Sequence, residues 1–249
     1  MVLKSWAVAL AAPTAAVCAV FTTKLQSHTI AAWDRYVETA ERQNANGRPP
    51  LNPIGDKPVL VDLNPNGDLA GRDVPDGYIH HWVGAIRIPG IPVASVRAVL
   101  EDYTDYPRIY APDVKQASAV KVAGGAYDVR MVMERIEGLL HFAFDVSSHV
   151  TFSESGGAVL VDSRSYRIRE SDSGHAPYTD LLPEGQDHGI LWRLNSYWRL
   201  RQMGPDVYAE CQVISLSRKP LFGMRDQIKS RARDSLAATL RGTRARAMR

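Results

Sequence analysis

The sequence predicts an α+β fold in which a curved antiparallel sheet of about six to seven strands packs against one long C-terminal helix. Strand-like segments with alternating apolar and polar residues follow one another from residue 114 to residue 217, separated by glycine-rich turns. Apolar residues then recur at four-residue steps from Met224 to Leu240, as they do along one face of a helix. Successive hairpins followed by a helix are typical of α+β proteins.

Residues 1–19 are expected to form a signal peptide. Lys4 supplies a positive charge, a short apolar run follows, and Val17 and Ala19 suit a cut after Ala19. The apolar run is shorter than the ~20 residues of a membrane-spanning helix. We therefore expect export to the periplasm or the medium; an uncleaved membrane anchor, or lipidation at Cys18, is the alternative.

Residues 20–77 are predicted to form a helix and then an arm rich in proline and glycine. Helical spacing extends from Ile30 to Arg42, and the Asn-Ala-Asn-Gly run at 44–47 ends it. Within the arm, only residues 57–63 have a strand-like pattern.

Residues 78–249 are expected to form the main domain. The pattern at 79–88 predicts its first strand, Pro92 opens a short helix, and a second short helix covers 103–109. The remaining strands are predicted at 114–122, 127–135, 139–152, 158–169, 189–203 and 207–217. The long helix begins after Pro220.

The net charge of +3 is unevenly distributed. Residues 218–249 contain ten Lys and Arg but two Asp, a formal charge of +8 that leaves −5 on the rest. We interpret this tail as the solvated outer face of the helix, with attraction to an anionic membrane surface as the alternative. No binding of nucleic acid is expected, because aromatic residues do not alternate with these cations.

Signatures of common enzyme chemistry are absent from the sequence. It contains no Gly-x-Ser-x-Gly elbow, phosphate-binding loop or dinucleotide-binding glycine pattern. Two cysteines, Cys18 and Cys211, exclude a disulfide framework and a multi-cysteine zinc site. Strand alternation sends His80 and His81 to opposite faces. We therefore predict no catalytic residue, no metal ligand and no cofactor.

Several motifs resemble START-like domains of the SRPBCC, or helix-grip, superfamily. They are Ile91-Pro92-Val93, the run from Val99 to Pro107 with Asp102-Tyr103-Thr104-Asp105-Tyr106-Pro107, and Ala111-Pro112-Asp113-Val114. With the long last helix, the resemblance covers about residues 78–247. The superfamily includes coenzyme Q-binding proteins, polyketide cyclases and lipid-transfer proteins. It implies a cavity between the sheet and the long helix that opens near the two short helices.

The predicted function is binding or transport of a hydrophobic small molecule (a lipid, a quinone or a polyketide-like compound) without catalysis. A cyclase-, aromatase- or hydrolase-like enzyme is the alternative, because one fold hosts many activities. A third hypothesis is an interaction module in which residues 20–77 dock a partner. The enzyme would need polar groups such as His188, Arg193 and Tyr197 to converge in the cavity.

The residues predicted to contact the ligand come from the expected mouth and the expected inner sheet face. They are Tyr106, Tyr110, Arg130, Met131, Phe144, Arg193 and Tyr197. Met133, Phe142 and Trp192 could line the cavity too or pack the core. The odd positions from 193 to 199 are polar, and normal alternation favours an outward face for them over a headgroup site.

Overall fold

The computed structural model describes residues 22–67, 74–137, 140–220 and 225–249. The expected signal peptide at residues 1–19 lies outside them. The main sheet has eight antiparallel strands in the order β2-β3-β10-β9-β7-β6-β5-β4. They are β2 (Val59–Asp62), β3 (Gly77–Ile88), β4 (Val114–Lys121), β5 (Tyr127–Glu137), β6 (Leu140–Ser155), β7 (Ala158–Ser171), β9 (Arg193–Met203) and β10 (Asp206–Arg218).

The predicted α+β class is confirmed, and the sheet is one strand larger than predicted. The additional strand is β2, which belongs to the arm and pairs with β3 from Val59↔Ala85 to Asp62↔Trp82. Its pattern is visible in the sequence, but pairing with a strand some 20 residues away is not.

The helices lie where the patterns predict them. They are α1 (Ser27–Ala45), α2 (Val93–Glu101), α3 (Tyr106–Ile109) and α4 (Arg225–Ala247), with 3₁₀ turns at Tyr103–Asp105 and Ala123–Gly125. A small second sheet joins β1 (Thr23–Lys24) to β8 (Gln186–Asp187).

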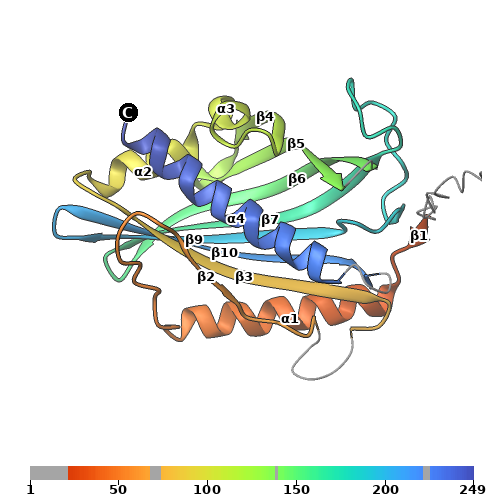
Figure 1. Ribbon diagram of the computed structural model, residues 1–249, viewed down its shortest axis with the longest axis horizontal. Helices are drawn as coiled ribbons and strands as arrows, with labels where there is room; N and C mark the ends of the chain where they lie inside the picture. The colour runs from red at the N-terminus through yellow and green to blue at the C-terminus, as the bar shows by residue number, and fades with distance from the viewer. Residues whose placement is uncertain (1–21, 68–73, 138–139, 221–224) are drawn as a thin grey trace, which may run out of the picture.

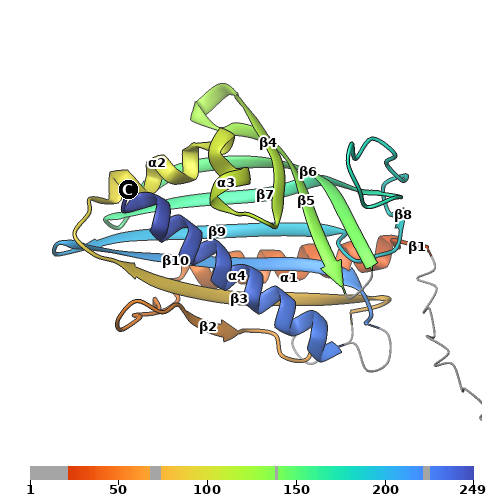
Figure 2. The same cartoon turned by 45° about the horizontal axis from the view of Figure 1, so that its top comes forward.

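Helix α4 crosses one face of the curved sheet, with β2 and β3 on one side of it and β4 and β5 on the other (Figures 1 and 2). Gly84 of β3 lies directly beneath α4. A Cβ atom there would lie 2.6 Å from a Leu60 methyl and 2.7 Å from a Leu240 methyl. A glycine therefore lets α4 seat directly on the strand.

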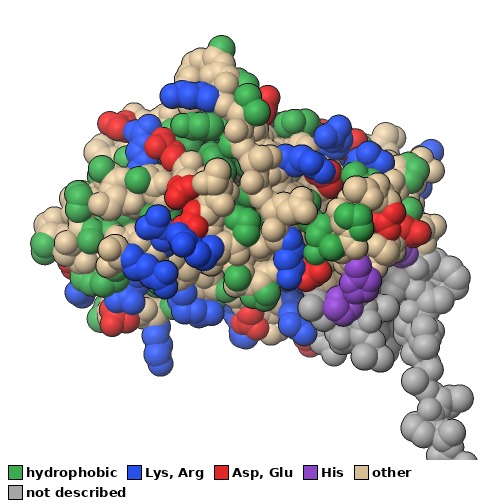
Figure 3. Space-filling view, turned by 90° about the horizontal axis from the view of Figure 1, so that it is seen from above, with side chains coloured by type: hydrophobic (Ala, Val, Ile, Leu, Met, Phe, Trp, Pro, Cys, Tyr) green, Lys and Arg blue, Asp and Glu red, His purple; other side chains and the backbone are tan. Residues whose placement is uncertain are grey.

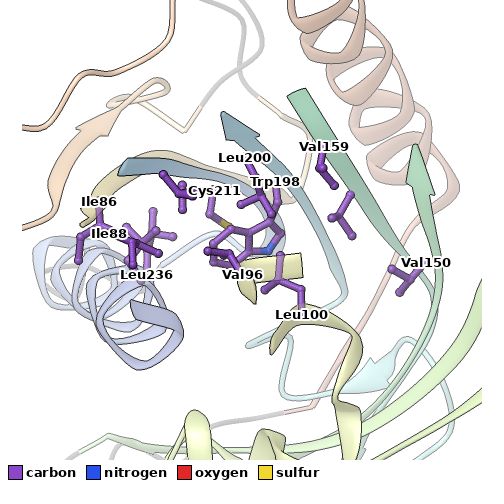
Figure 4. Close-up of a cluster of buried hydrophobic side chains, with 14 of the residues drawn as sticks. Ile86, Ile88, Val96, Leu100, Val150, Val159, Trp198, Leu200, Cys211 and Leu236 are labelled. Carbon is purple, nitrogen blue, oxygen red and sulfur yellow. The ribbon is translucent and has the colours of Figure 1, made fainter. Parts of the chain in front are cut away.

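A core lies between this face of the sheet and the helices above it. Ile86 and Ile88 of β3, Trp198 of β9 and Leu236 of α4 belong to one buried cluster, which Figure 4 shows with Cys211 beside Trp198. We call the α4 side of the sheet the concave face.

Helix α1 packs on the opposite, convex face (Figure 1). Its Trp33 and Val37 are buried in a second cluster with Ile79, Ile214 and Leu216. Polar contacts supplement this packing: the Tyr36 hydroxyl lies 2.8 Å from His81 Nδ1, and Asn44 donates to Gln212 at 2.6 Å. The sheet is thus covered on both faces, by α4 on one and α1 on the other.

Candidate ligand-binding site

Strand register decides which side chains reach the concave face. Met131 of β5 is paired with Val146 of β6, and Met133 is paired with Phe144. Residues directly opposite each other in an antiparallel ladder share a face, and their sequence neighbours take the other one. On β9, the same rule places Ser196 and Trp198 on the concave face, opposite Val213 and Cys211 of β10.

A cavity of about 230 Å³ lies between the concave face and α4. It is lined from the sheet, from α4 and from the α2–α3 region. Most of its lining side chains are apolar. They include Leu100, Val114, Val129, Met131, Met133, Val150, Val161, Leu191, Leu194, Trp198, Cys211, Val213 and Leu236. Such a lining suits a hydrophobic ligand.

Three tyrosines line the cavity near its exposed rim at Ala111. Their rings are in contact, with centroids 5.0 Å apart for Tyr103 and Tyr106 and 4.8 Å for Tyr106 and Tyr110. Burial raises the pKa of all three hydroxyls, so each is a neutral phenol at physiological pH.

The three hydroxyls differ in their hydrogen bonding. Tyr106 donates to the Leu100 carbonyl at 2.6 Å, and the Tyr110 hydroxyl lies 3.1 Å from Thr243 Oγ1 of α4. The Tyr103 hydroxyl is buried and has no hydrogen-bond partner within the described ranges. The Tyr106 hydroxyl therefore ties α3 to α2 and the Tyr110 hydroxyl ties the end of α3 to α4, while the Tyr103 hydroxyl remains available to a ligand.

The polar side chains of the lining are few. Asp113 accepts a hydrogen bond from Ser235 of α4 at 2.6 Å, which ties the segment after α3 to α4. Ser163 and Ser196 lie opposite each other on β7 and β9. Arg135, at the end of β5, is the other charged lining residue besides Asp113.

Three of the seven predicted contact residues line this cavity: Tyr106, Tyr110 and Met131. Met133 lines it as well. Phe144 lies on the concave face but packs into a buried cluster with Phe142, Val146 and Ile168 rather than lining the cavity. Ligand contact by the lining residues stays a prediction.

The placement of Arg130, Arg193 and Tyr197 at the cavity is wrong, because all three lie on the convex side. Arg130 directly precedes Met131, so alternation turns it away, and its guanidinium pairs with Asp145 at 2.8 Å. Arg193 donates to the Trp192 carbonyl at 2.8 Å. The Tyr197 hydroxyl donates to Glu41 of α1 at 2.7 Å.

Trp192 and His188 also lie away from the cavity lining. Trp192 is buried in the α1 cluster and donates through its indole nitrogen to Asp187 at 2.9 Å. His188 Nδ1 lies 2.7 Å from the buried carboxylate of Glu170, whose pKa burial raises. The enzyme hypothesis therefore loses the three polar residues on which it was based. Within the described residues, no cluster of three or more His, Cys, Asp or Glu could hold a metal ion.

Tyr103 and Arg135 are among the lining residues that sequence reasoning missed. Alternation could have found Arg135, because it lies two and four residues beyond Met133 and Met131 and so shares their face. Tyr103 belongs to a 3₁₀ turn, for which no face can be read from periodicity.

Comparison with solved structures identifies the architecture. Human STARD10 superimposes with a TM-score of 0.55 and 11% identity, covering 84% of this chain and 78% of that one. A STAR-related lipid transfer protein fragment from Xanthomonas axonopodis gives a TM-score of 0.51 and 15% identity, covering 78% of this chain and all of that one. The fold is START-like. The human StarD13 lipid transfer and protein localization domain agrees, with a TM-score of 0.51, 12% identity and coverage of 85% and 96%.

The cavity described above thus lies between sheet and last helix, as the START-like resemblance implied. Sequence comparison adds nothing further: no protein-family model matches the chain, and no curated protein matches it. In the part of the chain that the structure describes, no helix is both long enough and apolar enough to cross a membrane.

Proposed function

We propose that this protein binds and carries a hydrophobic small molecule in its START-like cavity, without catalysis. The observation that carries the proposal is the apolar lining between the concave face and α4. Apolar surface in a cavity favours ligands that would otherwise expose apolar area to water. The solved structures with this fold include proteins described as lipid-transfer proteins, which supports the same class of ligand.

The volume of the cavity limits which hydrophobic ligands can fit. Pockets for drug-sized ligands typically measure roughly 300–1,000 Å³. At about 230 Å³, this cavity suits a single chain or a compact ring system better than a lipid with two long chains.

An enzyme of the cyclase, aromatase or hydrolase kind is the second candidate. It would have to use polar groups of the cavity lining, such as Tyr103, Asp113 and Arg135. Asp113 is engaged by Ser235, and the pKa of the Tyr103 hydroxyl is raised, which disfavours it as a base at neutral pH. We therefore favour a carrier.

Export of the protein and its contact with an anionic membrane are also part of the proposal. Export rests on residues 1–19, as argued from their sequence. Contact with an anionic membrane rests on the basic last helix, yet several of its cations pair with acids, as in Lys229–Asp62, Arg244–Asp56 and Arg246–Asp105. Acidic side chains accordingly lie beside basic ones on the face in Figure 3. The membrane contribution is therefore smaller than the charge of +8 suggests.

Native mass spectrometry of the full chain, purified from its host and followed by solvent extraction, tests the proposal. We expect a stoichiometric hydrophobic molecule on the wild type. Val213→Phe places a ring in the cavity and should abolish this adduct, whereas Val120→Phe, at a site 68% exposed on β4, should retain it. An adduct that persists in a folded Val213→Phe variant would place the ligand elsewhere. No binding of any added hydrophobic compound would contradict the carrier function.

A further inference from the structure

Arg135 occupies an unusual position for an arginine. It lies on β5 on the same face as Met131 and Met133, and its side chain lines the cavity. The residue is partly buried, and its neighbours in the lining are mostly apolar. A guanidinium in such surroundings loses part of its hydration and needs compensation.

No such compensation comes from the described part of the protein. Within the residues that the structure describes, Arg135 forms no hydrogen bond and no ion pair. Other arginines of the sheet do: Arg130 makes three hydrogen bonds to Asp145, and Arg199 pairs with Glu210 at 2.7 Å. The contrast shows that this chain can neutralise arginines where their role is structural.

The described acidic and polar groups around the cavity do not neutralise the charge of Arg135. Asp113, the acidic residue of the lining, is held by the Ser235 hydroxyl at 2.6 Å and is not paired with Arg135. Ser163 and Ser196 offer neutral hydroxyls. His80 is buried and uncharged at neutral pH, since burial lowers its pKa to about 4, and the positive charge of Arg135 contributes to that shift. Among the described residues, the cavity therefore holds a cation without a counterion.

We propose that Arg135 binds the acidic group of an amphipathic ligand whose apolar body fills the rest of the cavity. The planar guanidinium presents five N–H donors in a fork that matches a carboxylate or a phosphate. The ligand class is thus an apolar chain or ring with one anionic oxygen group, and neutral lipids bind less well. This inference rests on the proposed function and specifies its ligand.

Affinity measurements with matched probes test the assignment. Decanoate, methyl decanoate and decyl phosphate share one alkyl chain and differ in the head group, so calorimetric titration of the full chain isolates the charge. Hydrogen bonds to charged groups contribute enough for about a tenfold to a hundredfold preference. We expect the wild type to bind decanoate or decyl phosphate at least about tenfold more tightly than the ester, and the stronger of the two anions identifies the head group.

Three variants complete the experiment. Arg135→Gln should remove the preference for the anion and leave ester affinity unchanged, while Arg135→Lys should keep part of it. Arg241→Gln removes an exposed cation of α4 that does not line the cavity and should behave as wild type. Because Arg135 has no partner among the described residues to lose, the melting temperature of Arg135→Gln should not fall below that of the wild type.

The outcomes separate the two proposals. Equal wild-type affinity for anions and ester, or loss of both in a folded Arg135→Gln variant, overturns the role of Arg135 and leaves the carrier function standing. Absence of binding by all three probes overturns the carrier function and this inference with it.

Discussion

The two faces of the sheet differ in how completely their polar side chains are paired. On the convex face, under α1 and the arm, they are paired: Glu210 accepts from Arg48, from Arg199 and from the Leu51 backbone, and Tyr197 is bound to Glu41. On the concave face the Tyr103 hydroxyl and the Arg135 guanidinium have no partner in the described part of the chain. Polar pairs on the convex face hold the N-terminal segment in place, whereas two polar groups on the concave face remain available to a ligand.

The largest expected effect of this difference is at Glu210. Its side chain is 4% exposed, and Glu210→Ala would leave the partly buried Arg48 and Arg199 without their carboxylate. Removing one partner of a buried ion pair costs about 3–5 kcal/mol. Urea denaturation should show this loss, whereas Arg135→Gln on the concave face should show none. Similar losses in the two variants would erase the distinction between the faces.

The adjacent buried histidines extend the comparison to pH. His80 faces α4 and His81 faces α1, and burial lowers the pKa of each from 6.5 to about 4. Between pH 4 and pH 6.5, the unfolded chain therefore binds more protons at these two histidines than the folded chain does. The contribution of the two neutral histidines to the free energy of unfolding is therefore fully present above about pH 6.5. It falls as pH decreases toward 4, by about 3 kcal/mol for each histidine.

Denaturation at a series of pH values measures this effect. In His81→Asn, the slope of unfolding free energy against pH between 6.5 and 4 should decrease by about one proton relative to wild type. An unchanged slope would mean that His81 is not the titrating group and that the acid sensitivity originates elsewhere.

The smallest expected effect comes from two tyrosine hydroxyls. Tyr197→Phe removes the hydrogen bonds to Glu41 and Asn195 on the convex face, which should cost about 1–2 kcal/mol. Tyr103→Phe removes a hydroxyl that has no partner among the described residues and should leave the unfolding free energy unchanged or slightly raised. A clear loss in Tyr103→Phe would reveal a protein partner for that hydroxyl and remove it from the ligand site.

Much of the fold could be predicted because its elements have regular periodicity. The predicted helix after Pro220 is α4, and the strand predicted at 158–169 is β7 at Ala158–Ser171. Helix α1 was predicted too, but its place on the sheet was not. Some partners of α1 lie far away in the sequence, for example Gln212, 168 residues from Asn44, and local patterns contain no information on such pairs.

The site was predicted less well, for a specific reason. Arg130 and Met131 are adjacent in one strand, so they cannot both reach the cavity, and composition alone could not choose between them. Counting from Met131 would have selected Arg135. The polar run at 193–199 misled in a similar way, because Arg193 and Tyr197 resemble a headgroup site in the sequence, whereas the structure pairs Tyr197 with Glu41 of α1 and Arg193 with Glu184.

The covering of the convex face by α1 has a consequence for biosynthesis. Helix α1 is among the first segments to be synthesised, yet the surface that buries Trp33 includes Ile214 and Leu216, which are synthesised near the end. The amphipathic helix therefore cannot complete its packing until most of the chain has been synthesised, and the contacts that complete its burial are of long sequence separation, which slows folding. A nascent chain of this protein thus exposes an apolar helix for as long as its last strand is missing, and depends in that interval on whatever protects exposed apolar segments from aggregation.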